Sequence, residues 1–352
     1  MYNCYAYTRP IWAGNTVLHE MFLPVGEREV AMLYPIDEIL SVQDACQSTT
    51  YVEGQDYELR DGRLYIPAGS RIAVMSMDDF HPMENDPALT SGAGFTHIDG
   101  GYIRFAEGSV FHQMQYEISY RHSGTWDGPA APYDPAKLPR TRKLLREGKH
   151  FRLGYLGDSI CVGANASGMG GVSPYMPIWP EMIRQRLTEL TGCTIDYRNR
   201  AVGGTVSGWG KENATEFFRD FAPDLFVIAF GMNDASGQVD RHVFRDNCRD
   251  IAEQIRKISP DCEFVFVSTT LPNPEADQFS KDRDHALHEG LLAALTEEYG
   301  EHAALAPVTS FHQYLLTKKN FRDMTGNNVN HPNDFMIRVY AQVILSTIIG
   351  EF

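Results

Sequence analysis

The stretch FRLGYLGDSICVG, residues 151–163, joins an apolar run to a glycine break and a serine flanked by an aspartate and an isoleucine. Such an unbroken apolar run is typical of a strand in a parallel sheet that is covered on both faces. Ser159 follows the run by two residues, and Gly157 and Gly163 permit tight turns around it. Because ligands bind such sheets at the carboxyl ends of the strands, we expect Ser159 at the ligand-binding edge. A serine after a strand is also a common helix cap, so other residues must decide between the two readings.

Strand-like and helix-like segments alternate from residue 149 to the carboxyl terminus. Apolar runs lie at 151–157, 194–201, 224–231, 263–270 and 303–309. Helical patterns fall between or after them, at 179–192, 214–222, 244–259, 284–300 and 334–350. Repeated β-α units of this kind predict a parallel sheet with helices on both faces. We therefore expect a three-layer α/β/α domain over residues 149–352.

The amino-terminal part has the period of two that is typical of strands. Short alternating runs lie at 28–36, 56–69, 71–76 and 111–122, without helical patterns between them. Asp61-Gly62, between two alternating runs, predicts a hairpin because both residues accept the positive φ of a tight turn. These features predict an all-β sandwich or jelly-roll domain over residues 1–123. Residues 124–148, which contain four prolines and a basic, helix-like end, are interpreted as a linker.

Composition limits the classes of partner. Lys plus Arg total 31 and Asp plus Glu total 46, and the formal net charge of -15 disfavours nucleic acid and anionic membranes. No signal-peptide pattern or long apolar segment is present, so we expect a cytoplasmic protein that does not associate with membranes. The six cysteines form no C-x-x-C pair, so we expect reduced thiols and neither a metal nor a cofactor. The oligomeric state is left open.

Four sequence blocks occur in an order that is characteristic of one enzyme family. They are GDSI with Ser159, NRAVGG ending at Gly204, GMND with Asn233, and NNVNHPND with His331. With these blocks the chain resembles the SGNH or GDSL-type hydrolases, a family of esterases, lipases, thioesterases and carbohydrate deacetylases. The resemblance covers roughly residues 150 to 350.

The resemblance implies a role for each of these residues. Ser159 is expected to attack an ester carbonyl while His331 takes its proton and later returns it to the leaving alcohol. The backbone N–H groups of Ser159 and Gly204 and the side-chain amide of Asn233 are expected to bind the oxyanion. All three donors are uncharged, and an amide donates without titrating.

One position departs from the family pattern, because Asn328 stands where an aspartate usually lies three residues before the histidine. Three possibilities follow. A Ser-His dyad is oriented by Asn328 or by a backbone carbonyl, a distant carboxylate such as Asp323 orients His331, or activity is weak. We favour the dyad. A second histidine pair, His285 and His288 on a helix, is interpreted as part of a solvated face and not as a metal site.

The favoured function is a serine esterase that removes acetyl or similarly short acyl groups from a carbohydrate. The predicted β domain motivates the sugar, because relatives with an amino-terminal jelly roll are often carbohydrate esterases. The expected substrate is therefore a small-molecule or oligosaccharide ester. The alternatives are a lipase or thioesterase of the same family and a catalytically weak carbohydrate-binding protein. The sequence does not show whether the amino-terminal domain lines the site.

Overall fold

A five-stranded parallel sheet forms the centre of the carboxyl-terminal half in the computed structural model, which describes residues 3–280 and 283–350. Its strands run in the order β11-β10-β9-β7-β8. In chain order they are β7 (Phe151–Gly157), β8 (Ile195–Asn199), β9 (Leu225–Ala229), β10 (Glu263–Val267) and β11 (Ala303–Ala306). Each lies within one of the five apolar runs, so the predicted α/β class is confirmed.

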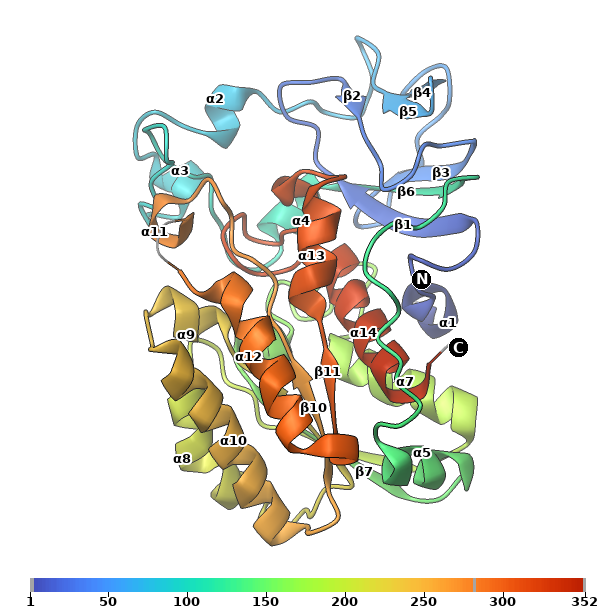
Figure 1. Ribbon diagram of the computed structural model, residues 1–352. Helices are drawn as coiled ribbons and strands as arrows, with labels where there is room; N and C mark the ends of the chain where they lie inside the picture. Colours follow the sequence, from blue (N-terminus) through green and yellow to red (C-terminus); the bar gives the residue numbers. More distant parts are fainter. Residues whose placement is uncertain (1–2, 281–282, 351–352) are drawn as a thin grey trace.

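Helices cover both faces of this sheet (Figure 1). One face packs against α7 (Trp179–Thr191) and α14 (Asp334–Ile349), and the other against α8 (Ser207–Phe218), α10 (Arg241–Ile258) and α12 (His285–Glu298). Successive residues of β9 contribute to opposite faces, since Val227 belongs to the first apolar cluster and Phe226 to the second. This two-sided burial explains why the strands are apolar without alternation.

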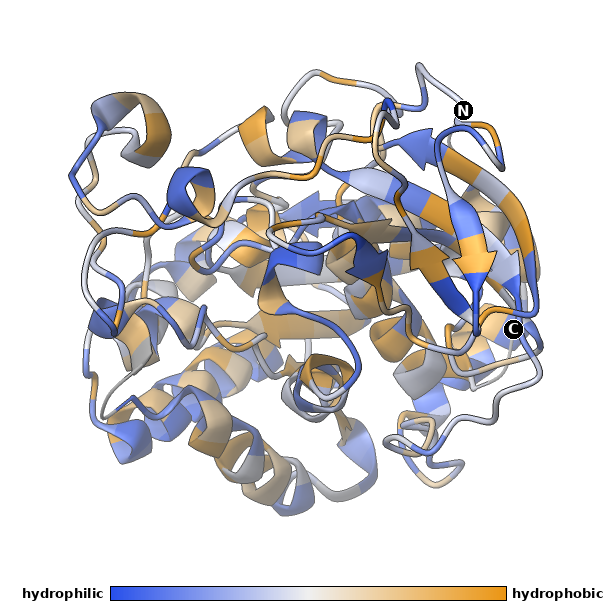
Figure 2. Ribbon diagram, turned by 90° about the horizontal axis from the view of Figure 1, so that it is seen from above, coloured by the Kyte–Doolittle hydropathy of each residue, from blue (hydrophilic) through white to orange (hydrophobic). Residues whose placement is uncertain are grey.

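The amino-terminal half is rich in strands, as predicted, and these form two small antiparallel sheets. The larger sheet has the order β1-β6-β3, from β1 (Thr16–Phe22), β3 (Glu38–Asp44) and β6 (Tyr116–Arg121). The smaller sheet has the order β2-β5-β4, from β2 (Glu29–Val30), β4 (Glu58–Arg60) and β5 (Arg63–Tyr65). Figure 2, which looks down on this half, shows hydrophobic and hydrophilic residues interspersed along its strands.

The predicted hairpin is present between β4 and β5. Arg60 pairs with Arg63, and Asp61 and Gly62 between them have φ values of 47° and 76°. A side chain with a β-carbon is disfavoured at such φ values except in Asn and Asp, which explains the Asp-Gly pair.

Two predicted strand segments are wrong. Residues 71–76 form no ladder, because the N–H of Ile72 bonds to the Ser70 hydroxyl and that of Ala73 to the Tyr116 hydroxyl, which leaves one bridge at Met75. The first part of 111–122 is helix α4 (Val110–Met114). Its end is closed by backbone bonds from Gln115 to Phe111 and His112, and the strand begins only at Tyr116.

The remaining helical segments are mostly short. They are α1 (Cys4–Thr8), α2 (Met77–Phe80), α3 (Pro87–Thr90), α5 (Pro139–Arg146), α6 (Ser159–Val162), α9 (Met232–Ser236), α11 (Asp277–Ser280), α13 (Val308–Leu316) and the 3₁₀ turns η1 (Gly300–His302) and η2 (Phe321–Asp323). Of these, α5 is the helix-like end of the segment interpreted as a linker. Among the described residues, no helix has both the length and the apolar character needed to span a bilayer.

The two halves share an apolar core and are joined by a buried ion pair of Lys319 and Glu20. Val42 and Ile118 of the amino-terminal sheet belong to the same buried cluster as Trp179 of α7 and Tyr340 of α14. Glu20 of β1 accepts a hydrogen bond of 2.6 Å from Lys319, and both side chains are fully buried. The same carboxylate accepts hydrogen bonds from the N–H of Leu33 and the hydroxyl of Tyr120. The halves are therefore joined by packing and by a charge pair that water does not reach.

We expect Lys319→Met to lower the free energy of unfolding by about 3–5 kcal/mol, because it leaves the buried Glu20 carboxylate without its counter-charge. Urea denaturation at neutral pH measures this effect. Arg63→Met, which breaks the exposed pair with Glu29, is the matched control and is expected to cost less than about 1 kcal/mol. Equal effects of the two substitutions would contradict a structural role for the buried pair.

Candidate active site

Ser159 lies at the carboxyl edge of the sheet, as expected from its position after the first apolar run. It is the first residue of α6, and the Asp158 carboxylate caps this short helix by accepting the N–H of Ile160 at 3.0 Å. A β-carbon on Gly157 would lie 2.4 Å from the carbonyl oxygen of Ala229, so only glycine lets β7 pass β9 this closely. Because β7 lies between β8 and β9, Ser159 follows an inner strand of the sheet and has loops on both sides.

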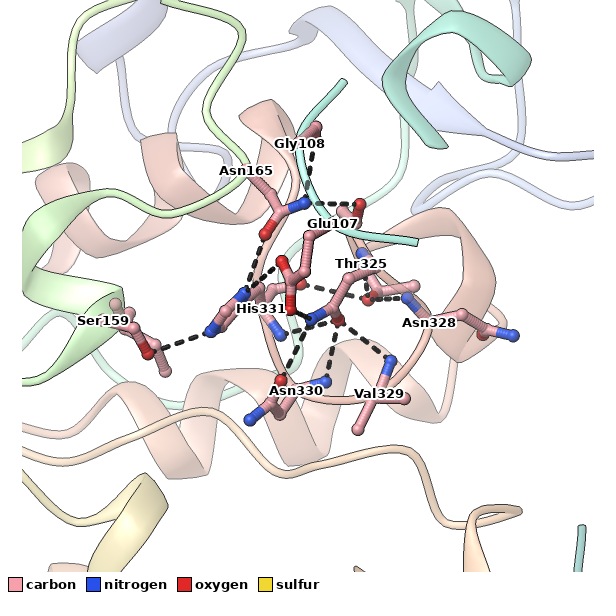
Figure 3. Close-up of polar contacts among 12 residues, drawn as sticks. Glu107, Gly108, Ser159, Asn165, Thr325, Asn328, Val329, Asn330 and His331 are labelled. Carbon is pink, nitrogen blue, oxygen red and sulfur yellow. Dashed lines mark hydrogen bonds and ion pairs between the residues drawn. The ribbon is translucent and has the colours of Figure 1, made fainter. Parts of the chain in front are cut away.

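The structure brings His331 to Ser159 from 172 residues further along the chain. The imidazole Nε2 lies 2.9 Å from the Ser159 hydroxyl oxygen (Figure 3). The loop that carries His331 is held by the buried Asn327, whose side-chain oxygen accepts the N–H groups of Val329, Asn330 and His331 at 3.0 Å each. This places a base within hydrogen-bond reach of a hydroxyl, which is the arrangement of an activated nucleophile.

Asn165 contacts the other side of the imidazole, with its side-chain oxygen 2.7 Å from Nδ1 of His331. Its side-chain nitrogen donates to the carbonyl oxygens of Gly108 at 2.9 Å and Gly326 at 3.0 Å. Carbonyl oxygens only accept, so the amide cannot be turned round without losing both bonds. The oxygen therefore faces the ring, and Nδ1 carries the proton of the neutral imidazole. Nε2 is then free to accept the proton of Ser159.

Glu107 is a second oxygen partner of the same ring nitrogen and comes from the amino-terminal half. Its carboxylate lies 3.1 Å from Nδ1 of His331 and accepts a hydrogen bond of 3.1 Å from the amide of Asn327. Burial acts to raise the pKa of Glu107, but bonds and charge from His331 and bonds from Asn327 and Asn165 outweigh it and leave the pKa lowered. The side chain is 52% exposed, so water screens part of this charge.

The prediction that Asn328 orients the histidine is wrong. Its side chain donates to the carbonyl oxygen of Arg104 at 3.0 Å and accepts from the amide of Asn273 at 3.3 Å. Its φ is 64°, and in Figure 3 its amide lies on the opposite side of the cluster from Ser159. The backbone direction at this residue therefore turns the side chain away from the imidazole.

The alternative carboxylate, Asp323, does not reach the ring either. It accepts the N–H groups of Leu23 at 2.8 Å and Asn320 at 3.2 Å, and so closes the turn at η2. The favoured alternative, a dyad whose histidine is oriented by a backbone carbonyl, is also wrong, because the partners of Nδ1 are the side chains of Asn165 and Glu107. A carboxylate from elsewhere in the chain does contact the ring, but it belongs to Glu107 in the amino-terminal half, where no site residue was predicted.

The expected oxyanion donors lie on neighbouring loops at the same edge. Gly204 follows β8 with a φ of 77°, and Asn233 lies in α9 after β9. The Asn233 amide nitrogen donates to the carbonyl oxygen of Thr205 at 3.0 Å, which ties the two loops together. A β-carbon on Gly203 would lie 3.6 Å from that of Ser159, so this loop runs directly beside the nucleophile. An amide has two N–H donors, so Asn233 retains one for a bound oxygen.

Two buried carboxyl groups support these loops. Burial raises the pKa of Asp158 to about 7, against the lowering effect of its hydrogen bond from Ile160. Burial also raises the pKa of Asp234, which accepts the backbone N–H of Ser207 at 3.0 Å and its hydroxyl at 2.5 Å. Asp234 thereby holds the start of α8 beside Asn233. Both groups position loops and do not contact the Ser159 hydroxyl or the imidazole.

The interpretation of His285 and His288 as a solvated face is wrong, because both are buried. The ring of His288 stacks on Phe244 of α10 with centroids 3.9 Å apart, and Nε2 of His285 lies 3.1 Å from the carbonyl oxygen of Met232 in α9. Burial lowers the pKa of each to about 4. The two residues face inward because this side of α12 packs against α9 and α10.

Residues 155–336 match the GDSL-like Lipase/Acylhydrolase family. Among solved structures, the chain is similar to a two-domain esterase (CEX) active on acetylated mannans, with 17% identity, a TM-score of 0.48 and coverage of 62% of this chain. The match spans only 54% of that esterase. It is also similar to the acetylxylan esterase Axe2 from Geobacillus stearothermophilus, with 16% identity, a TM-score of 0.46 and coverage of 56% and 94%. TesA matches with 19% identity, a TM-score of 0.43 and coverage of 57% and 99%. No curated protein sequence matches the chain.

We expect Glu107→Gln to lower kcat by roughly tenfold and Asn165→Ala by roughly tenfold to a hundredfold. The first removes the negative charge that stabilises the imidazolium, and the second removes the oxygen that fixes the tautomer. Steady-state hydrolysis of an activated acetyl ester measures both. Glu84→Gln, an equal charge change at an exposed site in the same half, is expected to leave kcat unchanged. If Glu107→Gln and Glu84→Gln behave alike, Glu107 has no part in catalysis.

The raised pKa of Asp158 predicts a pH-dependent cost to stability. The folded protein holds this proton more tightly than the unfolded chain, whose aspartates titrate near pH 4, so ionisation destabilises the fold as pH rises from about 4 to about 7. Asp158→Asn keeps an oxygen acceptor for the N–H of Ile160 and removes this cost. Its free energy of unfolding, relative to the parent protein, should therefore rise across this window by up to about 4 kcal/mol. Urea denaturation at several pH values tests this, and a difference independent of pH would refute it.

Proposed function

The chain belongs to the GDSL-like lipase/acylhydrolase family, and we propose that it is a serine esterase that removes acetyl or similarly short acyl groups from a carbohydrate. The contact that carries the hydrolase assignment is the 2.9 Å hydrogen bond between the Ser159 hydroxyl and Nε2 of His331. It is supported by the tautomer that Asn165 imposes on the ring.

The proposed reaction begins when the Ser159 oxygen attacks the ester carbonyl and its proton passes to Nε2 of His331. The imidazolium then carries protons on both nitrogens, and the one on Nδ1 is held by Asn165 and Glu107. The negative oxygen of the tetrahedral intermediate is bound by the N–H groups of Ser159 and Gly204 and by the amide of Asn233.

Collapse of the intermediate breaks the bond to the leaving alcohol, which takes the proton from Nε2 and leaves an acyl group on Ser159. Water then attacks the acyl carbonyl while Nε2 takes one of its protons. The second tetrahedral intermediate collapses, the carboxylic acid leaves, and the Ser159 oxygen regains its proton from the imidazolium. No step needs a metal ion or a cofactor.

One feature supports a polar alcohol as part of the substrate. The groups around the His331 side of the site are polar. The half-exposed Glu107 carboxylate and the partly exposed Asn330 amide offer hydrogen bonds to hydroxyl groups of the kind that a sugar carries.

We expect hydrolysis of p-nitrophenyl acetate and of acetylated oligosaccharides, and much slower hydrolysis of p-nitrophenyl palmitate. Ser159→Ala is expected to lower kcat by roughly a thousandfold or more, and Asn233→Ala by about 100- to 1,000-fold. A fluorophosphonate probe should label the parent protein and not Ser159→Ala, because only an activated serine reacts.

The same assays separate the alternatives. Rapid turnover of acyl-CoA or long-chain esters without activity on any acetylated sugar would reject the carbohydrate substrate and retain the serine hydrolase. Absence of both probe labelling and acetyl ester hydrolysis would reject the hydrolase assignment itself.

A further inference from the structure

Three metal-binding side chains meet away from the active site, where the two halves of the chain join. His81 follows α2, His97 lies in the loop after α3, and Glu275 precedes α11. One ligand atom from each lies within 4.8 Å of the others. Figure 1 shows α2, α3 and α11 on the same side of the molecule. We propose that His81, His97 and Glu275 bind a divalent transition metal ion, with Zn²⁺ as the best match to two imidazoles and one carboxylate.

The spacing of these atoms suits zinc. Zinc bonds to histidine nitrogen and carboxylate oxygen of about 2.0–2.1 Å in a tetrahedron place neighbouring ligand atoms about 3.3 Å apart. Nε2 of His81 and the carboxylate oxygen of Glu275 are 3.4 Å apart. This separation is longer than an ordinary hydrogen bond between these atoms, and it matches two ligands of one ion. The remaining ligand atom, at most 4.8 Å from the other two, has to approach by up to about 1.5 Å to reach the tetrahedral spacing.

His81 is available as a ligand because metal binding at Nε2 would break no short hydrogen bond of its ring. Its Nδ1 is buried and has no hydrogen-bond partner among the described residues. Its ring packs edge-on against Phe80 and His97, with centroids 4.7 and 4.3 Å apart. A metal at Nε2 would fix the tautomer and leave the proton on Nδ1.

The backbone fixes His97 and Glu275 to each other. His97 forms a bridge with Ala276, and the N–H of Ile98 donates to the carbonyl oxygen of Glu275 at 3.0 Å. Nδ1 of His97 accepts the exposed N–H of Asp99 at 3.1 Å. Ligation through Nε2 puts the ring proton on Nδ1, so metal binding breaks this one exposed hydrogen bond. The scaffold of the proposed site is therefore present before any ion binds.

The proposed ion would clamp the segment that carries Glu107. The N–H of Tyr102 donates to the carbonyl oxygen of Pro82 at 2.8 Å, and that of Arg104 to the carbonyl oxygen of Phe80 at 3.2 Å. These bonds connect the His81 segment to residues 102–104, three positions before Glu107. An ion that binds only the folded protein raises its stability, so zinc would secure the amino-terminal half against α11.

The test uses the full-length protein treated with a chelator and then titrated with zinc chloride in a calorimeter. We expect one equivalent to bind and the midpoint of thermal unfolding to rise. Loss of a partner outside the ligand set already weakens metal binding 10- to 100-fold, so His81→Ala and Glu275→Gln should each weaken it by about 100-fold or more. His150→Ala is the matched control. His150 lies 2.8 Å from the carboxylate of Asp196, is exposed, and should leave zinc binding unchanged.

Cobalt(II) gives a second measurement that does not depend on the variants folding. The parent protein should develop the visible absorption of a tetrahedral cobalt site with nitrogen and oxygen ligands. Absence of this spectrum together with no stoichiometric zinc binding would overturn the proposal, as would equal zinc affinity in His81→Ala and the parent protein. Both readouts are independent of ester hydrolysis, so they stand whether or not the proposed activity is found.

Discussion

The site depends on one constraint, which is that the imidazole of His331 is held between a hydroxyl on one nitrogen and two oxygens on the other. The 2.9 Å contact to Ser159 is useful only if Nε2 is unprotonated, and the Asn165 oxygen, 2.7 Å from Nδ1, requires this. The orientation of Asn165 is set in turn by two carbonyl oxygens that can only accept. A neutral amide thus fixes the tautomer, and the Glu107 carboxylate adds the charge that stabilises the imidazolium.

This arrangement makes the amino-terminal half part of the catalytic site. Glu107 and the carbonyl of Gly108 come from that half, and both act on the imidazole or on its partner Asn165. The buried pair of Glu20 and Lys319 and the shared apolar core hold the halves in register. The strand-rich half therefore supplies groups that contact the imidazole and its partner Asn165.

Much of the fold could be predicted from sequence because buried strands and helices place apolar residues at characteristic spacings. The five strands and their covering helices follow unbroken or amphipathic apolar patterns, and Asp61-Gly62 marks its hairpin through backbone conformation. Ser159 and His331 stand out because each lies within a recognisable sequence block. Helix α4 and residues 71–76 were missed because side-chain hydroxyls and local helix bonds took the N–H groups that a ladder would use. His285 and His288 were misplaced because α12 packs on more than one neighbour.

The partners of His331 could not be found in this way. Glu107 is separated from it by 224 residues and Asn165 by 166, and neither residue type is unusual in a loop. Asn165 lies six residues after Ser159, which is the one positional signal that the sequence offers. Asn328 occupied the expected position in sequence, but its backbone conformation directs the side chain elsewhere. Sequence spacing identified the block that contains His331. Only the three-dimensional contacts show that Asn165, and not Asn328, accepts the hydrogen bond from its ring.

Nitrogen NMR of the protein with ¹⁵N-labelled histidine, with His331→Ala used for assignment, reports which ring nitrogen of His331 carries the proton. We expect the neutral ring to be protonated on Nδ1 and unprotonated on Nε2. A neutral ring protonated on Nε2 would contradict this expectation, because such a ring could not take the proton of Ser159.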